Sequence, residues 1–260
     1  MTEIFTDPTA PPPSPRPRVV VLHSRDIWQA LRAGASDFRK VPLFGLAFSA
    51  VYVVGGFLML WLGAGHVTWT LATSLGFPLA APFAAVGLYE VSRRLETGEL
   101  LSWSAVLGVI WNERGRQVPW LGWIILIFFL FWTFLAHLIF ALFMGLSEIT
   151  NISNDMSMFL TPLGLQMLAA EFVVGAAMGI LLFSITVVSL PLLLDREVDF
   201  VTAMITSVQV VTANPLPMVL WAVLIGVSTI LALLPWFLGL TVVLPIFGHA
   251  TWHLYRRALD

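Results

Sequence analysis

Residues 118–143 read VPWLGWIILIFFLFWTFLAHLIFALF and contain no Asp, Glu, Lys or Arg. A helix of this length extends about 39 Å at 1.5 Å per residue, which exceeds the roughly 30 Å of hydrocarbon in a bilayer. Apart from its tryptophans, its only polar side chains belong to Thr133 and His137. The stretch therefore predicts a transmembrane helix, and with it a membrane protein.

Five further stretches are apolar enough, and long enough as helices, to cross a bilayer. With the first they predict an all-α polytopic protein of six transmembrane helices, arranged as three hairpins. We place the six spans near Val41–Gly63, Thr70–Val91, Val118–Phe143, Pro162–Ser189, Leu216–Leu234 and Pro235–Tyr255.

The composition of the whole chain agrees with this class. Hydrophobic residues make up 58% of the 260 residues and charged residues only 11%, which is less than half the charge of an ordinary soluble domain. This balance excludes a soluble enzyme, a disordered protein and a nucleic-acid binder with a basic face. The chain has no cysteine, so disulfides, iron–sulfur clusters and thiolate nucleophiles are also excluded.

Basic residues are confined to one side of the predicted topology. All 13 lie before span one, between spans two and three, between spans four and five, or after span six. They are Arg16, Arg18, Arg25, Arg32, Arg39, Lys40, Arg93, Arg94, Arg114, Arg116, Arg196, Arg256 and Arg257. Because basic residues collect on the cytoplasmic side, we expect both termini in the cytoplasm and the protein in the bacterial inner membrane.

The N-terminal segment differs from the rest of the chain. Six of its first 18 residues are prolines, and it has no apolar run that could pack or act as a signal peptide. We expect residues 1–24 to form a disordered, proline-rich cytoplasmic tail and residues 25–257 to form the six-helix transmembrane domain.

Three cytoplasmic segments share a pattern that suggests an internal repeat. Each has apolar residues at helical spacing, is too short and polar to cross, and precedes a proline at the start of a span. The segments begin at Asp26, Leu101 and Asp199, and the prolines are Pro42, Pro119 and Pro215. We expect three interfacial amphipathic helices and a pseudo-threefold arrangement of three hairpins; the alternative is that such cytoplasmic loops are simply common.

Two passages carry a family resemblance: residues 82–96, PFAAVGLYEVSRRLE, and residues 189–199, SLPLLLDREVD. With the later Ala203, Asn214 and Trp221, they resemble an uncharacterised bacterial family of six-span integral membrane proteins, sometimes labelled cytochrome c oxidase subunit-like. The resemblance implies no particular reaction. A haem–copper catalytic subunit needs more spans and several membrane histidines, so the label is compatible only with an accessory or assembly role.

Glu171 is the one acid expected well inside a span, where an ionisable group costs about 2.5–3.5 kcal/mol on insertion scales. Gly175 and Gly179 follow at spacings of four, so we expect all three on one helix face, with the glycines packed against another helix. We expect His137 at a similar depth and in contact with Glu171, directly or through water; the alternative is a histidine bonded to a backbone carbonyl. Glu171 itself is either a proton or cation site or a buried hydrogen-bond anchor.

Charged and histidine clusters near the cytoplasmic ends are the other candidates. We expect an ion-paired collar there, with a docking face for a partner or for anionic headgroups as the alternative. The cluster residues are Glu90, Arg93, Arg94, Glu96, Asp195, Arg196, Glu197 and Asp199. His249 and His253, four apart on one helix face, are a weak metal candidate, because two ligands do not make a site.

No catalytic constellation appears, so no catalytic residue and no cofactor is expected. The favoured hypothesis is a non-enzymatic accessory, assembly or scaffold component of a membrane complex, and the resemblance suggests a respiratory complex as one candidate. The alternative is a small-solute or ion transporter that uses Glu171, and a haem or metal enzyme is the least favoured. The expected partners are the lipid bilayer and another membrane protein, with no nucleic acid.

Overall fold

A computed structural model describes residues 17–61, 67–145 and 156–260. The elements of the described chain are helical, apart from one isolated antiparallel bridge between Val19 and Leu259. They are α1 (Ser24–Lys40), α2 (Pro42–Trp61), α3 (Val67–Thr97), α4 (Trp103–Glu113), α5 (Val118–Met144), the short 3-10 helix η1 (Met156–Leu160), α7 (Pro162–Thr186), α8 (Ser189–Asp195), α9 (Phe200–Ala213), α10 (Pro215–Leu233) and α11 (Leu240–Ala258). The expected all-α architecture is confirmed.

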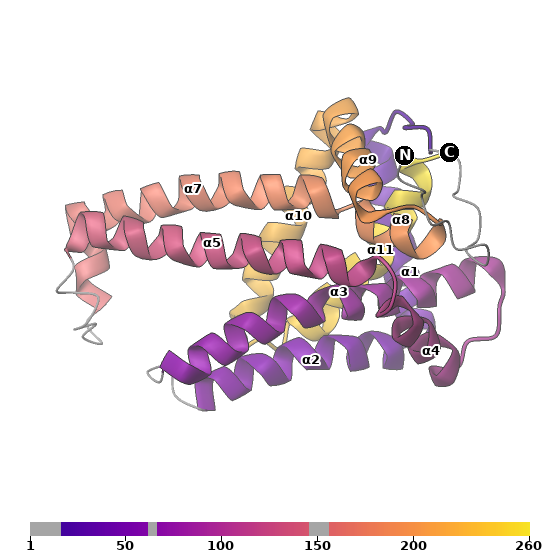
Figure 1. Ribbon diagram of the computed structural model, residues 1–260, viewed down its shortest axis with the longest axis horizontal. Coiled ribbons are helices and arrows are strands. Elements are labelled where there is room, and N and C mark those ends of the chain that lie inside the picture. The colour runs from indigo at the N-terminus through magenta and orange to yellow at the C-terminus, as the bar shows by residue number, and fades with distance from the viewer. Residues whose placement is uncertain (1–16, 62–66, 146–155) are drawn as a thin grey trace, which may run out of the picture.

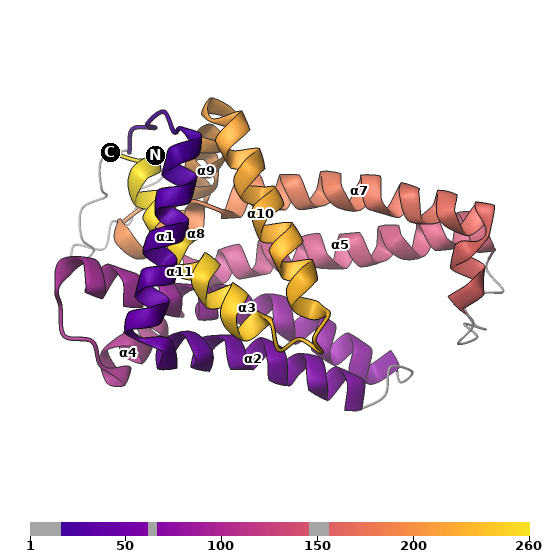
Figure 2. The same cartoon turned by 180° about the vertical axis from the view of Figure 1, so that it is seen from behind.

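Long helices project from a packed end of the molecule. Figure 1 shows α5 and α7 side by side, and α2 and α3 side by side, each pair extending away from the end that holds both chain termini. Seen from behind in Figure 2, α1 lies across the end of α2, and α10 and α11 form a third pair that runs obliquely. The termini are joined by backbone hydrogen bonds, from Val20 N to Ala258 O at 2.9 Å and from Asp260 N to Arg18 O at 3.0 Å.

Three helices of the described chain are long and apolar enough to cross a membrane. They are Val118–Met144, Pro162–Asp195 (α7 continued by α8) and Pro215–Leu233. A fourth candidate is the pair α1 and α2, which meets the same criteria together but is bent by 101° between Lys40 and Pro42. Apolar membrane-capable helices are thus confirmed, while the count of six spans stays a prediction.

The helix of the last expected span, α11, is not among these candidates, and its composition gives the reason. It carries His249 and His253 and ends in Arg256 and Arg257. Charged and histidine side chains lower the mean hydropathy of a helix, so α11 is less apolar than α5.

The last helix starts later than expected. Residues 234–239 form turns between α10 and α11, where Trp236 and Phe237 adopt positive φ angles of 53° and 65°. A helix cannot continue through such residues, so α11 begins at Leu240 and not at Pro235. The expected hairpin turn therefore lies at the predicted place but is longer.

Helices form at all three expected cytoplasmic positions, as α1, α4 and α9. The helix after each begins at or next to proline: at Pro42 in α2, Pro119 in α5 and Pro215 in α10. Proline suits the first turn because its missing N–H would have no intrahelical partner there. That the three units repeat one another stays a prediction.

The expected N-terminal tail lies outside the described residues as far as residue 16. The remainder is tied to the body of the protein: Asn214, buried at the start of α10, accepts a hydrogen bond from Leu22 N (2.6 Å) and donates one to Val20 O (3.1 Å). The described chain before Asp26 is therefore packed rather than free.

The main core lies at the end that holds the termini. There Trp221, Trp252 and Tyr255 are fully buried, together with the side of α1 that faces α11. The two helices approach so closely at Gly34 that an added Cβ would lie 2.5 Å from Ala250 N and 2.6 Å from Ile246 O. Only glycine permits this contact.

We therefore expect Gly34→Ala to lower the thermal unfolding temperature in detergent, because overpacking against backbone costs about 1–3 kcal/mol. Gly108→Ala is the matched control, since an added Cβ at Gly108 in α4 meets nothing within 4 Å. Its unfolding temperature should stay the same or rise, as alanine favours the helix. Equal effects of the two substitutions would contradict this account of the α1–α11 contact.

Candidate functional site

Glu171 lies on α7 and lines an apolar groove of about 810 Å³. The groove is bounded by side chains of α5 and α7, with Ala81 of α3 and Ile230 of α10 at its margins. Glu171 is the one charged residue of the lining, which otherwise consists of Ala, Gly, Ile, Leu, Met, Phe and Trp. No hydrogen bond or ion pair joins Glu171 to another described residue.

His137 forms no direct hydrogen bond to Glu171 among the described contacts. Its Nδ1 lies 2.7 Å from the carbonyl oxygen of Thr133, one turn earlier in α5. Within the described residues, no hydrogen bond or ion pair connects His137 with Glu171. The helix's own backbone thus engages one imidazole nitrogen, as the alternative interpretation predicts.

The two glycines after Glu171 have different surroundings. A Cβ on Gly175 would lie 2.8 Å from the Trp132 ring, so this glycine lets α5 and α7 approach each other. A Cβ on Gly179 would meet nothing within 4 Å, although Gly179 also lines the groove. The expected packing role thus has a described contact at Gly175, whereas Gly179 faces open space.

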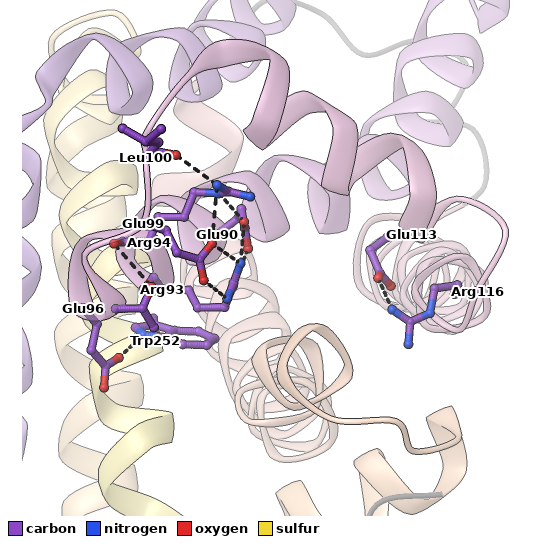
Figure 3. A network of polar contacts seen from close by, with 10 residues as sticks. Glu90, Arg93, Arg94, Glu96, Glu99, Leu100, Glu113, Arg116 and Trp252 are labelled. Atoms are coloured by element: carbon purple, nitrogen blue, oxygen red, sulfur yellow. Dashed lines mark hydrogen bonds and ion pairs between the residues drawn. The ribbon is translucent and has the colours of Figure 1, made fainter. Parts of the chain in front are cut away.

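At the other end of the molecule, Glu90 is the centre of an ionic network (Figure 3). Its carboxylate is fully buried and accepts hydrogen bonds from Arg93 Nε at 2.8 Å and from Arg94 Nε at 2.5 Å. The two guanidinium groups also reach Glu99, and Arg94 donates to the carbonyl of Leu100 at 3.0 Å. These contacts close the C-terminal end of α3 and its following loop.

Two more carboxylates connect α3, α8 and α11. Glu96 accepts hydrogen bonds from Trp252 Nε1 at 2.8 Å and from Arg256 Nε at 3.2 Å. Asp195, at the end of α8, accepts one from the Tyr255 hydroxyl at 2.6 Å and lies 3.5 Å from Arg256. Arg256 therefore bridges the ends of two helices that are far apart in sequence.

The remaining cluster residues have local roles. Arg116 bridges Glu113, at 2.7 Å, and Glu197. Asp199 caps α9 by accepting from Thr202 N at 2.9 Å, and Arg196 is the C-cap residue of α8. The described contacts of these clusters are those of an ion-paired collar.

A buried polar group that the sequence analysis missed lies between α1, α3 and α11. Asp37 Oδ2 accepts hydrogen bonds from the Ser92 hydroxyl at 3.0 Å and from His253 Nε2 at 2.7 Å. His249 Nδ1 lies 2.8 Å from the same hydroxyl, so it carries the proton of that bond, because the hydroxyl donates to the carboxylate. In the sequence, the indication of this buried group is Asp37, an acid on the side of α1 that carries Ala30 and Gly34.

This arrangement does not support the weak metal prediction for His249 and His253. The two imidazoles are engaged with Ser92 and Asp37, and no group of three or more His, Asp or Glu residues in the described chain converges on a place that could hold a metal ion. Ser92 is fully buried and shares its hydroxyl between an acid and an imidazole, which suits a structural role better than a nucleophilic one.

The surroundings of two carboxyl groups, those of Asp37 and Glu113, shift their pKa values in opposite directions. Burial alone would raise the pKa of Asp37, but the hydrogen bonds from His253 and Ser92 and the nearby imidazoles outweigh it, so the pKa is lowered. Burial raises the pKa of Glu113 despite the neighbouring Arg116. Asp37 is therefore held as a carboxylate by its partners.

Glu90→Gln should destabilise the protein by about 3 kcal/mol, because it breaks a buried ion pair. We expect the lower end of the usual range, since both arginines still have Glu99 as an ionic partner. Glu99→Gln, at the exposed member of the same network, is the control and should have a much smaller effect. Thermal unfolding of the two purified variants in detergent measures the difference. Similar losses would show that Glu90 is not the centre of the network.

The Asp37 group should make stability depend on pH in acid. Because its folded pKa lies below the unfolded value, the carboxylate stabilises the fold above about pH 4, and this stabilisation is lost as the pH falls through the folded pKa. Asp37→Asn should be less stable than wild type near neutral pH, and the two unfolding temperatures should converge in acid. A constant difference across the range would refute the assignment.

Comparison with known proteins places the chain among membrane proteins. No curated protein and no solved structure matches it. Residues 70–195, which run from α3 to α8 and include Glu90, His137 and Glu171, match the model of a family described as "Predicted integral membrane protein (DUF2189)". This match confirms the expected resemblance: residues 70–195 are similar to that family of predicted integral membrane proteins.

Proposed function

We propose that this protein is a non-enzymatic accessory or scaffold component of a membrane complex, and that the groove containing Glu171 receives a transmembrane helix of a partner protein. The observation that carries the proposal is an acid with no hydrogen-bond or ion-pair partner among the described residues, in an open, otherwise apolar groove between membrane-capable helices. Such a groove offers contact area to an apolar helix and a hydrogen-bond acceptor to one polar group on it.

The energetics favour a protein occupant over lipid tails. An acid left in hydrocarbon costs about 2.5–3.5 kcal/mol on insertion scales, and a partner side chain that donates a hydrogen bond removes part of that cost. Lipid tails offer no donor. The open space at Gly179, eight residues after Glu171 on α7, lets a second helix come close to the α7 backbone.

The loose packing of α5 and α7 also supports a partner helix in the groove. Few residues of these two spans are buried, and large side chains such as Phe172 and Val173 are 76% and 66% exposed. The opposite end of the molecule is densely packed and ion-paired. The α5–α7 hairpin is therefore packed at one end, and along the rest of its length its surface is available to lipid and to other transmembrane helices.

Orientation and localisation belong to the same proposal. The two ends of the described chain lie side by side, which supports an even number of crossings, and we propose six spans in three repeated hairpins. The basic residues at that end support a cytoplasmic location of both termini. The bacterial inner membrane is the location that this charge distribution favours. The interfacial placement of α1, α4 and α9 is part of the proposal.

The transporter alternative has weaker support. A carrier that uses Glu171 needs a polar path to it, and the described lining of the groove is apolar apart from Glu171 itself. The acid can still exchange protons with a substrate in another state of the protein. Proton-linked uptake into liposomes that is abolished by Glu171→Gln would establish this alternative and overturn the scaffold proposal.

The docking proposal predicts which substitutions release a partner. Gly179→Leu should fill the open part of the groove and abolish co-purification of a partner in mild detergent, and Glu171→Gln should weaken it by about 1 kcal/mol or more, the value of an interhelical hydrogen bond in membranes. Gly226→Leu is the matched control, because Gly226 is also helical, has nothing within 4 Å of an added Cβ and does not line the groove.

The measurement is quantitative mass spectrometry of proteins that co-purify with each variant from native membranes. Proteins retained by wild type and Gly226→Leu but lost with Gly179→Leu are the partners that the proposal requires. If every associated protein is retained equally by all variants, or if wild type purifies alone, the groove is not a docking site.

A further inference from the structure

The outward side of α1 carries a row of arginines. Arg25, Arg32 and Arg39 are seven residues apart, which is close to two helical turns, so they lie along one side of the helix. All three are exposed. Trp28 lies between the first two on the same side and is 48% exposed. We call these four residues the α1 arginine face.

The packing of α1 fixes the direction of this face. Ile27, Ala30, Gly34 and Asp37 are buried, and Gly34 lies against the backbone of α11. Because α1 cannot rotate without losing that contact, the opposite side, with its arginines, must point away from the protein.

No acidic side chain of the described chain neutralises the arginine face. The two acids of α1 are engaged elsewhere: Asp26 accepts a hydrogen bond from His23 N at 2.7 Å, and Asp37 is buried with Ser92 and His253. Arg39 bonds only to a carbonyl of its own helix, that of Ala35 at 3.1 Å. The face therefore presents three positive charges to whatever lies beside it.

The angle between α1 and α2 supports a position of this face at the membrane surface. One residue separates Lys40 from Pro42, and the two helix axes meet at 101° (Figure 2). If α2 crosses the bilayer, α1 must lie along its surface at the depth of the phosphate groups. An exposed tryptophan among arginines suits that depth, because tryptophan concentrates at the headgroup level.

We propose that the α1 arginine face binds the headgroups of anionic phospholipids in the cytoplasmic leaflet. Guanidinium groups match phosphate with paired hydrogen bonds, and anionic leaflets attract basic segments next to a span. The binding holds α1 flat on the membrane and fixes the bend before α2. This inference is independent of the partner proposed for the Glu171 groove.

The test measures binding of a fluorescent phosphatidylglycerol to the purified, delipidated protein in neutral detergent, with phosphatidylcholine as the uncharged comparison. Each basic residue near an anionic surface contributes about a fivefold factor, so Arg25→Gln, Arg32→Gln and Arg39→Gln together should weaken phosphatidylglycerol binding about a hundredfold. Phosphatidylcholine binding should not change. Raising the salt from about 0.1 M to about 1 M should weaken the wild type similarly.

Matched variants separate charge from folding. The triple replacement of the same arginines by lysine keeps the charge and should retain most of the binding. If the triple glutamine variant fails to fold, Arg32→Gln alone, at the centre of the face, should lower the affinity about fivefold. Unchanged phosphatidylglycerol affinity in a folded glutamine variant, or equal wild-type affinity for both lipids, would overturn the proposal.

Discussion

Charged side chains are costly in hydrocarbon, and the organisation of this protein follows from that cost. Its described ion pairs lie in and around the C-terminal ends of α3, α4, α8 and α11 and in α1, all at the end of the molecule where the chain termini meet. Glu90 shows the arrangement most clearly, because its fully buried carboxylate is held by two arginines from its own helix. The collar gathers charge at one end and leaves the long helices apolar.

This division gives the molecule two parts with different properties. The charged end has buried aromatic residues, ionic bridges between distant segments and the tight glycine contact of α1 with α11. The α5–α7 hairpin has few buried residues, and its surface is mostly apolar and exposed. An acid would be ordinary in the charged end. Glu171 lies on α7, in the apolar hairpin, and there an acid needs an explanation. The proposed partner helix supplies the hydrogen-bond donor that Glu171 does not find among residues 17–61, 67–145 and 156–260.

The sequence predicted the helices well because their signals are local. Long apolar runs mark α5, α7 and α10, and prolines mark the starts of α2, α5 and α10 within a residue or two. The sequence predicts the start of α11 five residues too early, because Pro235 resembles a helix-starting proline and no glycine indicates the positive φ angles of the next two residues.

The candidate site was harder to predict because its contacts join residues far apart in the chain. Asp37 bonds to His253 and Glu96 to Trp252, across most of the sequence, and no local pattern pairs them. The predicted contact between His137 and Glu171 rests on depth alone, but depth does not fix which way a side chain faces, and His137 Nδ1 lies against the carbonyl oxygen of Thr133 in its own helix. The two glycines after Glu171 share a spacing yet only Gly175 has a packing partner, because facing side chains, not spacing, decide a contact.

The most direct test of the docking account uses the absence of cysteine from the chain. Gly179→Cys can be labelled with a photoreactive maleimide in native membranes and irradiated, with Gly226→Cys as the control. We predict one discrete adduct at position 179 that joins the chain to a different membrane protein and is missing at position 226. Only lipid adducts, an adduct of twice the chain's 28.7 kDa mass, or the same products at both positions would contradict the account.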